Sequence, residues 1–380
     1  MKIPFFRTTV TGDEKRYIEN CLSNPDSFSE KKYTAKCENW FKENHGIKNF
    51  LLTKSCSHSL ELAAIVLGIK TGDEVILPSY AFVACGNAFA LRGAKCVYVD
   101  IRPDTMNIDE TKIEQAITPR TKAIVTLNYA SISCNYTAIK KIANENNLYL
   151  IEDNAHGILA EYRKGEFLGS FGDISTFSFD HLKNISCGQG GGIAINNESL
   201  LENFFIHYEF GTNRRSFLKG KVDRYEWIDL GSNYPLSELN AAILFAQLEK
   251  AEEINRKFVR LSEMYNSRLS ELCAQGKIEL PAYLPGGKHN GHCFYIKTKD
   301  SEERGKLIKF LRNRDINAQF HYTPLHNSEY GRVAGTFVGE DRYTSSHSKR
   351  LLRLPLYYEL KPEELDEVAG AVSDFYSTHF

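Results

Sequence analysis

The 380-residue chain lacks the features of secreted, disulfide-stabilised and membrane-spanning proteins. Its nine cysteines contain no Cys-x-x-Cys pair and cannot all pair within one chain, which indicates reduced thiols. No apolar run approaches the roughly 20 residues that a membrane-spanning helix requires, and the amino terminus contains no signal-peptide core. We therefore predict a cytoplasmic protein without a membrane partner.

The sequence also lacks an excess of charge of either sign. Lysine plus arginine number 47 and aspartate plus glutamate 48, which gives a net charge of −1. Without a basic field, neither nucleic acid nor an anionic membrane is a favoured partner. The 42% of hydrophobic residues can form a substantial core, and no internal repeat or low-complexity tract is visible. A small-molecule substrate is the favoured partner.

The order of hydrophobic patterns predicts an α/β fold. From about residue 50 to 196, short β-branched runs alternate with helical patterns, which is typical of βαβ units around a mainly parallel sheet. Helices are predicted between the strands, including 57–67, 82–91 and 110–116, the last with Asp109 as its cap. The predicted strands are 49–53, 74–78, 96–101, 123–127, 148–152, 174–179 and 192–196.

The second half of the chain predicts a smaller α+β unit. An amphipathic pattern over 236–273 has no internal proline or glycine and predicts one helix that connects two domains. A strand at 293–297, a helix at 302–311 and a final helix from Pro362 follow. We expect a large domain at residues 1–250 and a small domain at 251–380.

Polar residues follow three of the predicted strands, where open α/β sheets bind ligands. The small residues of 53–59 precede an apolar helix and suit a phosphate. The strand 148–152 leads to Glu152 and Asp153, which alternation places on opposite faces, so that one acid can meet a ligand while the other pairs elsewhere. Lys183 follows the strand 174–179 and precedes a glycine-rich run, where a lysine can form a Schiff base.

Each of these segments also has an ordinary interpretation. The first resembles a serine-rich helix cap, the second a solvated strand end, and the third a surface lysine. A phosphate loop, an acid and a lysine in this order are nevertheless the parts of a pyridoxal 5′-phosphate (PLP) site, because that cofactor needs an acid beside its pyridine nitrogen. Their joint occurrence favours a PLP enzyme.

The runs at 72–80, 102–111, 320–326 and 339–344, together with these segments, resemble the DegT/DnrJ family of sugar aminotransferases. The resemblance covers nearly the whole chain. It implies the PLP-dependent aspartate-aminotransferase fold (fold type I), with a large domain around a mainly parallel sheet and a smaller α+β carboxyl-terminal domain. It also implies PLP as the cofactor and no metal.

By this resemblance, Lys183 forms the Schiff base and Asp153 is the partner of the pyridine nitrogen. His156 lies against the ring hydroxyl. Phe82 stacks on the cofactor ring, although a phenylalanine on a helix would otherwise be expected in the core.

The resemblance further implies how the phosphate is bound. Ser178 contacts it, and the backbone around Cys56 and Ser57 completes the cradle. Asn233 matches an asparagine that reaches the cofactor phosphate of the neighbouring subunit, which implies a homodimer. Tyr322 and His326, within the 320–326 run, are the candidate substrate-binding residues.

The implied reaction transfers an amino group from L-glutamate to a nucleotide-linked keto-sugar. The substrate implied is dTDP-4-keto-6-deoxyglucose, aminated at C4 to dTDP-4-amino-4,6-dideoxygalactose for surface polysaccharide. Three alternatives stay open at this point: the glucose-configured epimer, a UDP-linked sugar, and a non-catalytic PLP-fold binding or regulatory protein.

Several positions depart from the family pattern. Residues 29–32 replace a Gly-Asp-Gly turn, and Asn128 and Ser131 replace a histidine and a later glycine. Residues 180–182, Gln189 and Pro235 also differ. We expect these changes to lie around the substrate and to leave the lysine, the acid and the phosphate serine in place.

Overall fold

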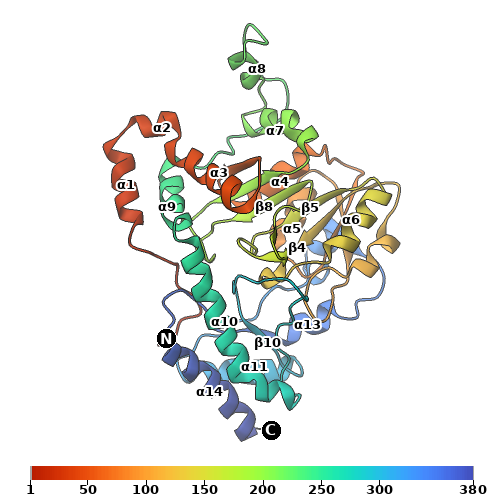
Figure 1. The fold of residues 1–380 in the computed structure, drawn as a ribbon. Coiled ribbons are helices and arrows are strands. Elements are labelled where there is room, and N and C mark those ends of the chain that lie inside the picture. The colour runs from red at the N-terminus through yellow and green to blue at the C-terminus, as the bar shows by residue number, and fades with distance from the viewer. Residues whose placement is uncertain (1, 380) are drawn as a thin grey trace.

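The computed structural model describes residues 2–379 and arranges the large domain around an eight-stranded sheet (Figure 1). The strand order is β1-β9-β8-β5-β4-β2-β3-β11, and β9 alone runs in the direction opposite to the other strands. The predicted mainly parallel α/β sheet is confirmed. The strands are β1 Phe50–Thr53, β2 Glu74–Pro78, β3 Lys95–Val99, β4 Thr121–Leu127, β5 Tyr149–Asp153, β8 Ile174–Ser178, β9 Gly191–Ile195 and β11 Gly335–Phe337.

Helices cover both faces of this sheet because its strands are apolar on both sides. On β2, Val75 and Leu77 pack in the same cluster as Phe89, whereas Ile76 packs on the other face with Ile139. This is the burial expected of parallel strands between two helical layers. The helices packed against the sheet are α4 Cys56–Val66, α5 Val83–Ala90, α6 Tyr136–Glu145 and α7 Leu201–Tyr208, and the first two also line the site.

The predicted helix over 236–273 is two helices, α9 Glu238–Leu248 and α10 Ala251–Ala274. Lys250 leaves helical geometry with φ −109° and ψ 12°. Its amine lies 2.6 Å from Asp13 Oδ2, a contact 237 residues away in sequence that the amphipathic pattern cannot report. Helix α9 packs against α1 Glu14–Ser23 and α3 Lys32–His45, which precede the sheet.

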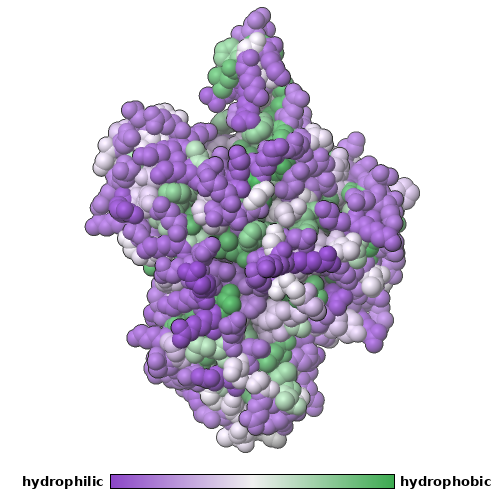
Figure 2. All heavy atoms as spheres, viewed as in Figure 1, coloured by the Kyte–Doolittle hydropathy of each residue, from purple (hydrophilic) through white to green (hydrophobic). Residues whose placement is uncertain are grey.

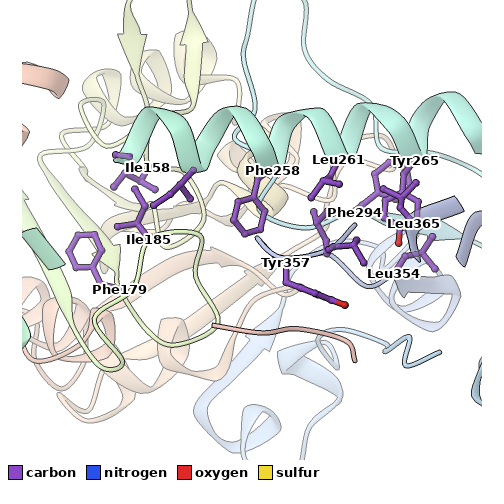
Figure 3. Packing of buried hydrophobic residues seen from close by; sticks show 14 of the residues in the cluster. Ile158, Phe179, Ile185, Phe258, Leu261, Tyr265, Phe294, Leu354, Tyr357 and Leu365 are labelled. Carbon is purple, nitrogen blue, oxygen red and sulfur yellow. The ribbon is translucent and has the colours of Figure 1, made fainter. Parts of the chain in front are cut away.

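Helix α10 connects the large domain to the carboxyl-terminal region (Figure 3). Phe258 and Tyr265 lie on its buried face, and Tyr265 stacks on Phe294 with ring centroids 5.0 Å apart. Ile158 and Ile185 of the large domain join the same core cluster. One continuous apolar core therefore runs beneath α10 from the sheet to the final helix.

The carboxyl-terminal region contains the small antiparallel pair of β10 Tyr295–Lys297 and β12 Leu351–Arg353. Strand β11 returns to the large sheet and pairs parallel with β3. The expected boundary between a large domain at residues 1–250 and a small domain at 251–380 stays a prediction. The helices here are α11 Ser301–Arg312, α12 Gly331–Ala334, α13 Thr344–Arg350 and α14 Pro362–His379, and the remaining short elements of the chain are α2 Asp26–Glu30, β6 Glu161–Arg163, β7 Glu166–Phe167, α8 Arg214–Leu218 and the 3₁₀ turns at 110–112, 114–116, 129–131, 198–200 and 325–327.

The predicted α-helix over 110–116 is wrong in type. Two 3₁₀ turns, Glu110–Lys112 and Glu114–Ala116, take its place, with Ile113 between them. Asp109 does cap the first turn, because its carboxylate accepts a hydrogen bond from the Thr111 amide at 3.0 Å.

A segment around α8 projects from the large domain (Figures 1 and 2). Phe210, Leu218, Tyr225 and Trp227 are exposed on it, with Trp227 79% exposed. Such a group of exposed apolar side chains is typical of an interaction surface. None of the described helices combines the length and apolarity needed to span a bilayer.

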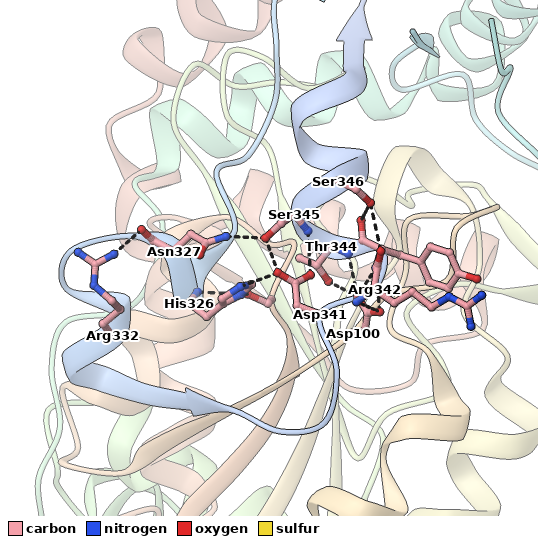
Figure 4. Close-up of polar contacts among 11 residues, drawn as sticks. Asp100, His326, Asn327, Arg332, Asp341, Arg342, Thr344, Ser345 and Ser346 are labelled. Carbon is pink, nitrogen blue, oxygen red and sulfur yellow. Dashed lines mark hydrogen bonds and ion pairs between the residues drawn. The ribbon is translucent and has the colours of Figure 1, made fainter. Parts of the chain in front are cut away.

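Asp100, just beyond β3, fastens the 339–344 run to the sheet (Figure 4). Its buried carboxylate accepts hydrogen bonds from the amides of Arg342, Tyr343 and Thr344 at 2.8 to 3.3 Å. The Thr344 hydroxyl donates a further bond at 2.5 Å. One side chain thus provides the acceptors for the turn that begins α13.

We predict that Asp100→Ala lowers the free energy of unfolding by roughly 2–4 kcal/mol, because buried amide donors lose their acceptor. Urea unfolding at fixed protein concentration measures the change. Asp109→Ala is the control, since it removes only a cap and should cost about 1 kcal/mol. Equal losses in the two variants would contradict the role of Asp100.

Candidate active site

A cavity of about 820 Å³ opens where β5 and β8 end. Eight of the ten predicted site residues line it: Cys56, Ser57, Phe82, Asp153, His156, Ser178, Lys183 and Tyr322. The fold therefore brings together segments that lie more than 260 residues apart in the chain.

Glu152 and Asp153 face opposite sides of the end of β5. Glu152 is fully buried and accepts hydrogen bonds from the amides of Gly169 and Phe171 at 2.6 and 3.0 Å, and from Asn128 Nδ2 at 2.9 Å. Asp153 lines the cavity instead. The structure thus separates a carboxylate that is already bonded from one that faces a ligand.

Asp153 is a buried acid with few donors of its own. Its Oδ2 accepts from Cys85 Sγ at 2.9 Å, and its Oδ1 accepts from the Ala155 amide at 3.0 Å. Burial raises the pKa of Asp153, while Cys85, the Ala155 amide and the charge of Lys183 act in the other direction. A cation beside it, such as a protonated pyridine nitrogen, would stabilise its ionised form.

Lys183 lies in the loop after β8, where its amide donates to Asp180 O at 2.9 Å. The next residue, Asn184, holds this loop: its Nδ2 donates to Asn290 O at 2.9 Å, and its Oδ1 lies 3.0 Å from His292 Nδ1. Burial lowers the pKa of Lys183, although Cys56 and Asp153 oppose the shift. A lysine of lowered pKa is a better nucleophile toward an aldehyde.

The start of α4 forms a corner suited to phosphate. Ser55 caps the helix by accepting from the His58 amide at 3.2 Å, and the first helical amides, at Cys56 and Ser57, have no intrahelical acceptor. Ser178 pairs with Gly191 across β8 and β9.

Gly191 keeps this corner open. A Cβ atom there would lie 2.3 Å from the carbonyl carbon of Ser55 and 2.4 Å from the amide nitrogen of Cys56. Only glycine lets β9 approach the start of α4 so closely. The pairing with Gly191 thus brings Ser178 beside the start of α4, and these residues fit the phosphate of PLP.

Histidines form another wall of the cavity. His156 stacks on His292 with ring centroids 4.1 Å apart, and its Nδ1 accepts from the Ala130 amide at 3.3 Å. His156 Nε2 lies 3.4 Å from the Tyr322 hydroxyl. Burial and then the charge of Lys183 hold the pKa of His156 well below its ordinary value. A neutral His156 that accepts at Nδ1 carries its proton on Nε2, the nitrogen available to a ligand.

Phe82 is not a core residue. It precedes α5, is 53% exposed and lines the cavity, 6.0 Å from the ring of Tyr322. An exposed ring at the cavity is free to stack on a ligand, as the resemblance implies.

Two predicted residues lie outside the cavity. His326 bonds Ser79 Oγ at 2.6 Å and Asp341 Oδ2 at 3.0 Å through its two ring nitrogens (Figure 4). Asn233 is exposed and bridges to Glu209 at the base of the projecting segment. Their roles toward substrate and toward a partner's cofactor stay predictions.

The departures from the family pattern fall into two groups. Residues 180–182 and Gln189 line the cavity. Asn128 and Ser131 are buried and do not line it: Asn128 bonds Glu152, and Ser131 Oγ accepts from the Asn290 amide at 3.0 Å. The expectation that the changes surround the substrate is wrong for these two, which hold the frame of the site, and residues 29–32 and Pro235 do not line the cavity either.

Sequence reasoning missed His292, His321, Cys85 and Arg353, although all except Cys85 line the cavity and Cys85 bonds Asp153. His321 lies in the 320–326 run, but no feature of that run distinguishes it as a site residue. The others follow no recognisable strand-end pattern. Only the three-dimensional packing brings them to the site.

The fold and the cavity define a PLP enzyme of fold type I. The chain matches the DegT/DnrJ/EryC1/StrS aminotransferase family over residues 9–373, and it belongs to that family. It is a sugar aminotransferase, and the predicted PLP cofactor is confirmed.

Relatives of known structure or name support this assignment. The chain is 30% identical to GDP-perosamine synthase of Escherichia coli O157:H7 over 384 residues, 99% of each chain. The aminotransferase TlmJ from Streptoalloteichus hindustanus is 26% identical with a TM-score of 0.88 over 100% of both chains. NtdA from Bacillus subtilis, solved with bound cofactor PMP, is 29% identical with a TM-score of 0.84 over 97% of this chain and 83% of that chain.

We predict that Lys183 titrates below the ordinary lysine value of 10.5 in the apoprotein. Its amine is neutral above its pKa, so at a given pH more of it is reactive than at an exposed lysine. NMR titration of ¹³C-methylated lysines, assigned with Lys183→Arg, measures this pKa. In Asp153→Asn the pKa of Lys183 should fall further, because the charge of Asp153 raises that pKa. The prediction would be contradicted if Lys183 titrated over the same pH range as the exposed lysines.

Proposed function

We propose that the protein transfers the amino group of L-glutamate to C4 of dTDP-4-keto-6-deoxyglucose and forms dTDP-4-amino-4,6-dideoxygalactose. We further propose that it does so in the cytoplasm, for surface polysaccharide. The observation that carries the proposal is the meeting of Lys183, Asp153 and the start of α4 in one cavity of about 820 Å³. A cavity of this size exceeds what the cofactor alone requires and leaves room for a sugar nucleotide.

PLP supplies an electron sink when it is bound. The start of α4 and Ser178 would hold its phosphate, and Asp153 would hold a proton at the ring nitrogen. His156 would donate from Nε2 to the ring hydroxyl. Each assignment places a ring substituent against a group of matching charge or hydrogen-bonding type.

Lys183 carries the protons. Its amine, of lowered pKa, would accept a proton from the donor's α-carbon in the first half-reaction. In the second half-reaction it would return a proton to C4 of the sugar. The face of C4 that receives this proton decides between galactose and glucose configuration, and residues 180–182, beside Lys183 in the cavity, are placed to orient the sugar.

The test supplies the purified protein with glutamate and one keto-sugar nucleotide, and identifies the product by NMR. We predict turnover of dTDP-4-keto-6-deoxyglucose to the axial, galactose-configured amine. Because one relative is named GDP-perosamine synthase, a GDP-linked keto-sugar is tested as a comparison substrate, together with a UDP-linked one. An equatorial amine, or turnover restricted to GDP- or UDP-sugars, would overturn the substrate proposal.

We also propose a homodimer in which Asn233 serves the partner's cofactor. The exposed apolar side chains around α8 and the exposure of Asn233 outside its own cavity support it. A symmetric dimer would bury this surface twice and complete two sites.

Mixing two inactive variants tests this arrangement. Lys183→Ala lacks the lysine, and Asn233→Asp places a negative charge where the phosphate of the partner's cofactor would bind. After exchange of subunits at a 1:1 ratio, we predict about a quarter of wild-type activity, because half of the dimers then contain one intact site. If Asn233 served its own chain, no mixture would recover activity; a stable, active monomer in light scattering would remove the dimer itself.

A further inference from the structure

Arg353 is a cation that lines the cavity. It is the last residue of β12, and among residues 2–379 it has no ion pair. Its guanidinium makes one long hydrogen bond, from Nη2 to Phe320 O at 3.5 Å. Its Nε is buried and has no hydrogen-bond partner in the described part of the chain. A buried donor on a charged group is costly unless a ligand satisfies it.

The guanidinium is held in place by its surroundings. The backbone of Arg353 exchanges two hydrogen bonds with Gln319, at 2.8 and 3.0 Å. Its guanidinium carbon lies 4.6 Å from the ring centroid of Phe5, which also lines the cavity. An arginine stacked on an aromatic face keeps its planar fork of donors free for a carboxylate or a phosphate.

Arg353 lies beside the segment that carries His321, one of the histidines that line the cavity. Burial and then the charge of Arg353 hold the pKa of His321 well below its ordinary value, and His321 lies 3.7 Å from the Tyr322 ring. Tyr322 in turn contacts His156. The phosphate corner, at the start of α4, has donors of its own. An anion at Arg353 is therefore distinct from the cofactor phosphate.

We propose that Arg353 binds the carboxylate of the amino donor. Two anions enter this site under the proposed function, on which the inference rests: the carboxylate of glutamate and the diphosphate of the sugar nucleotide. The α-carboxylate is one bond from the carbon that bears the amine, whereas the diphosphate lies across the sugar ring from C4. Arg353 lines the same cavity as Lys183, and its side chain bonds Phe320 O, next to the cavity-lining His321, so it fits the nearer anion.

Measuring the two half-reactions separately shows which of these two anions Arg353 binds. The first is the bleaching of the PLP absorbance by glutamate, and the second is its recovery when the keto-sugar nucleotide is added to the pyridoxamine form. In Arg353→Met we expect the glutamate concentration for half-maximal bleaching to rise about 10- to 100-fold, since a charge-assisted pair is lost. The concentration dependence of the second half-reaction should not change. Arg353→Lys should recover only part of the loss, because an ammonium lacks the fork.

Binding without turnover gives a second readout. Calorimetry of succinate with the PLP form should show the same 10- to 100-fold loss in Arg353→Met. Arg332→Met, which removes an exposed arginine on α12, is the control and should behave as wild type.

Each outcome decides a different claim. If the wild type is not bleached by glutamate, the proposed function fails. If the wild type is bleached and Arg353→Met has the same glutamate and succinate dependence, the role of Arg353 is wrong. If only the second half-reaction weakens, Arg353 binds the diphosphate and the carboxylate assignment is overturned.

Discussion

The site depends on a buried carboxylate that never faces it. Glu152 accepts hydrogen bonds from the 169–172 turn, from Ser175 and from Asn128, and these bonds fix the end of β5 against β8 and β4. Because side chains alternate along a strand, fixing Glu152 on one face obliges Asp153 to face the cavity. A one-residue slip of β5 would exchange the two acids and bury the wrong one.

A second constraint positions the phosphate corner at the start of α4. Strand β9 runs against its neighbours, so Gly191 pairs with Ser178 and lies directly against the start of α4. The helix amides at this corner, Lys183 and Arg353 all line the one cavity, and Arg353 bonds Phe320 O, next to His321. Because burial lowers the pKa of the cavity histidines, they add little positive charge beside these groups, which we assign to the phosphate, the aldehyde and the carboxylate respectively.

Much of this arrangement could be predicted from the sequence because it is local. The strands around Glu152, Ser178 and Gly191 follow from apolar runs, and the chemistry follows from the polar residues at their ends. The break between α9 and α10 could not be predicted, because it involves a contact between Lys250 and the distant Asp13. Neither could Arg353, since an arginine in a short strand is ordinary until the fold shows that its buried Nε has no hydrogen-bond partner among residues 2–379.

The central claim is the division of labour between the two adjacent acids. Single-turnover bleaching of the PLP absorbance by glutamate, measured on Asp153→Asn and Glu152→Gln, tests it most directly. Losing the charge at Asp153 should slow bleaching at least about 10- to 100-fold while the cofactor still binds. Glu152→Gln should slow bleaching much less than Asp153→Asn does, because it touches no ligand, but it should unfold at lower urea concentration. A stalled Glu152→Gln beside a normal Asp153→Asn would show that the two faces of β5 have been assigned the wrong way round.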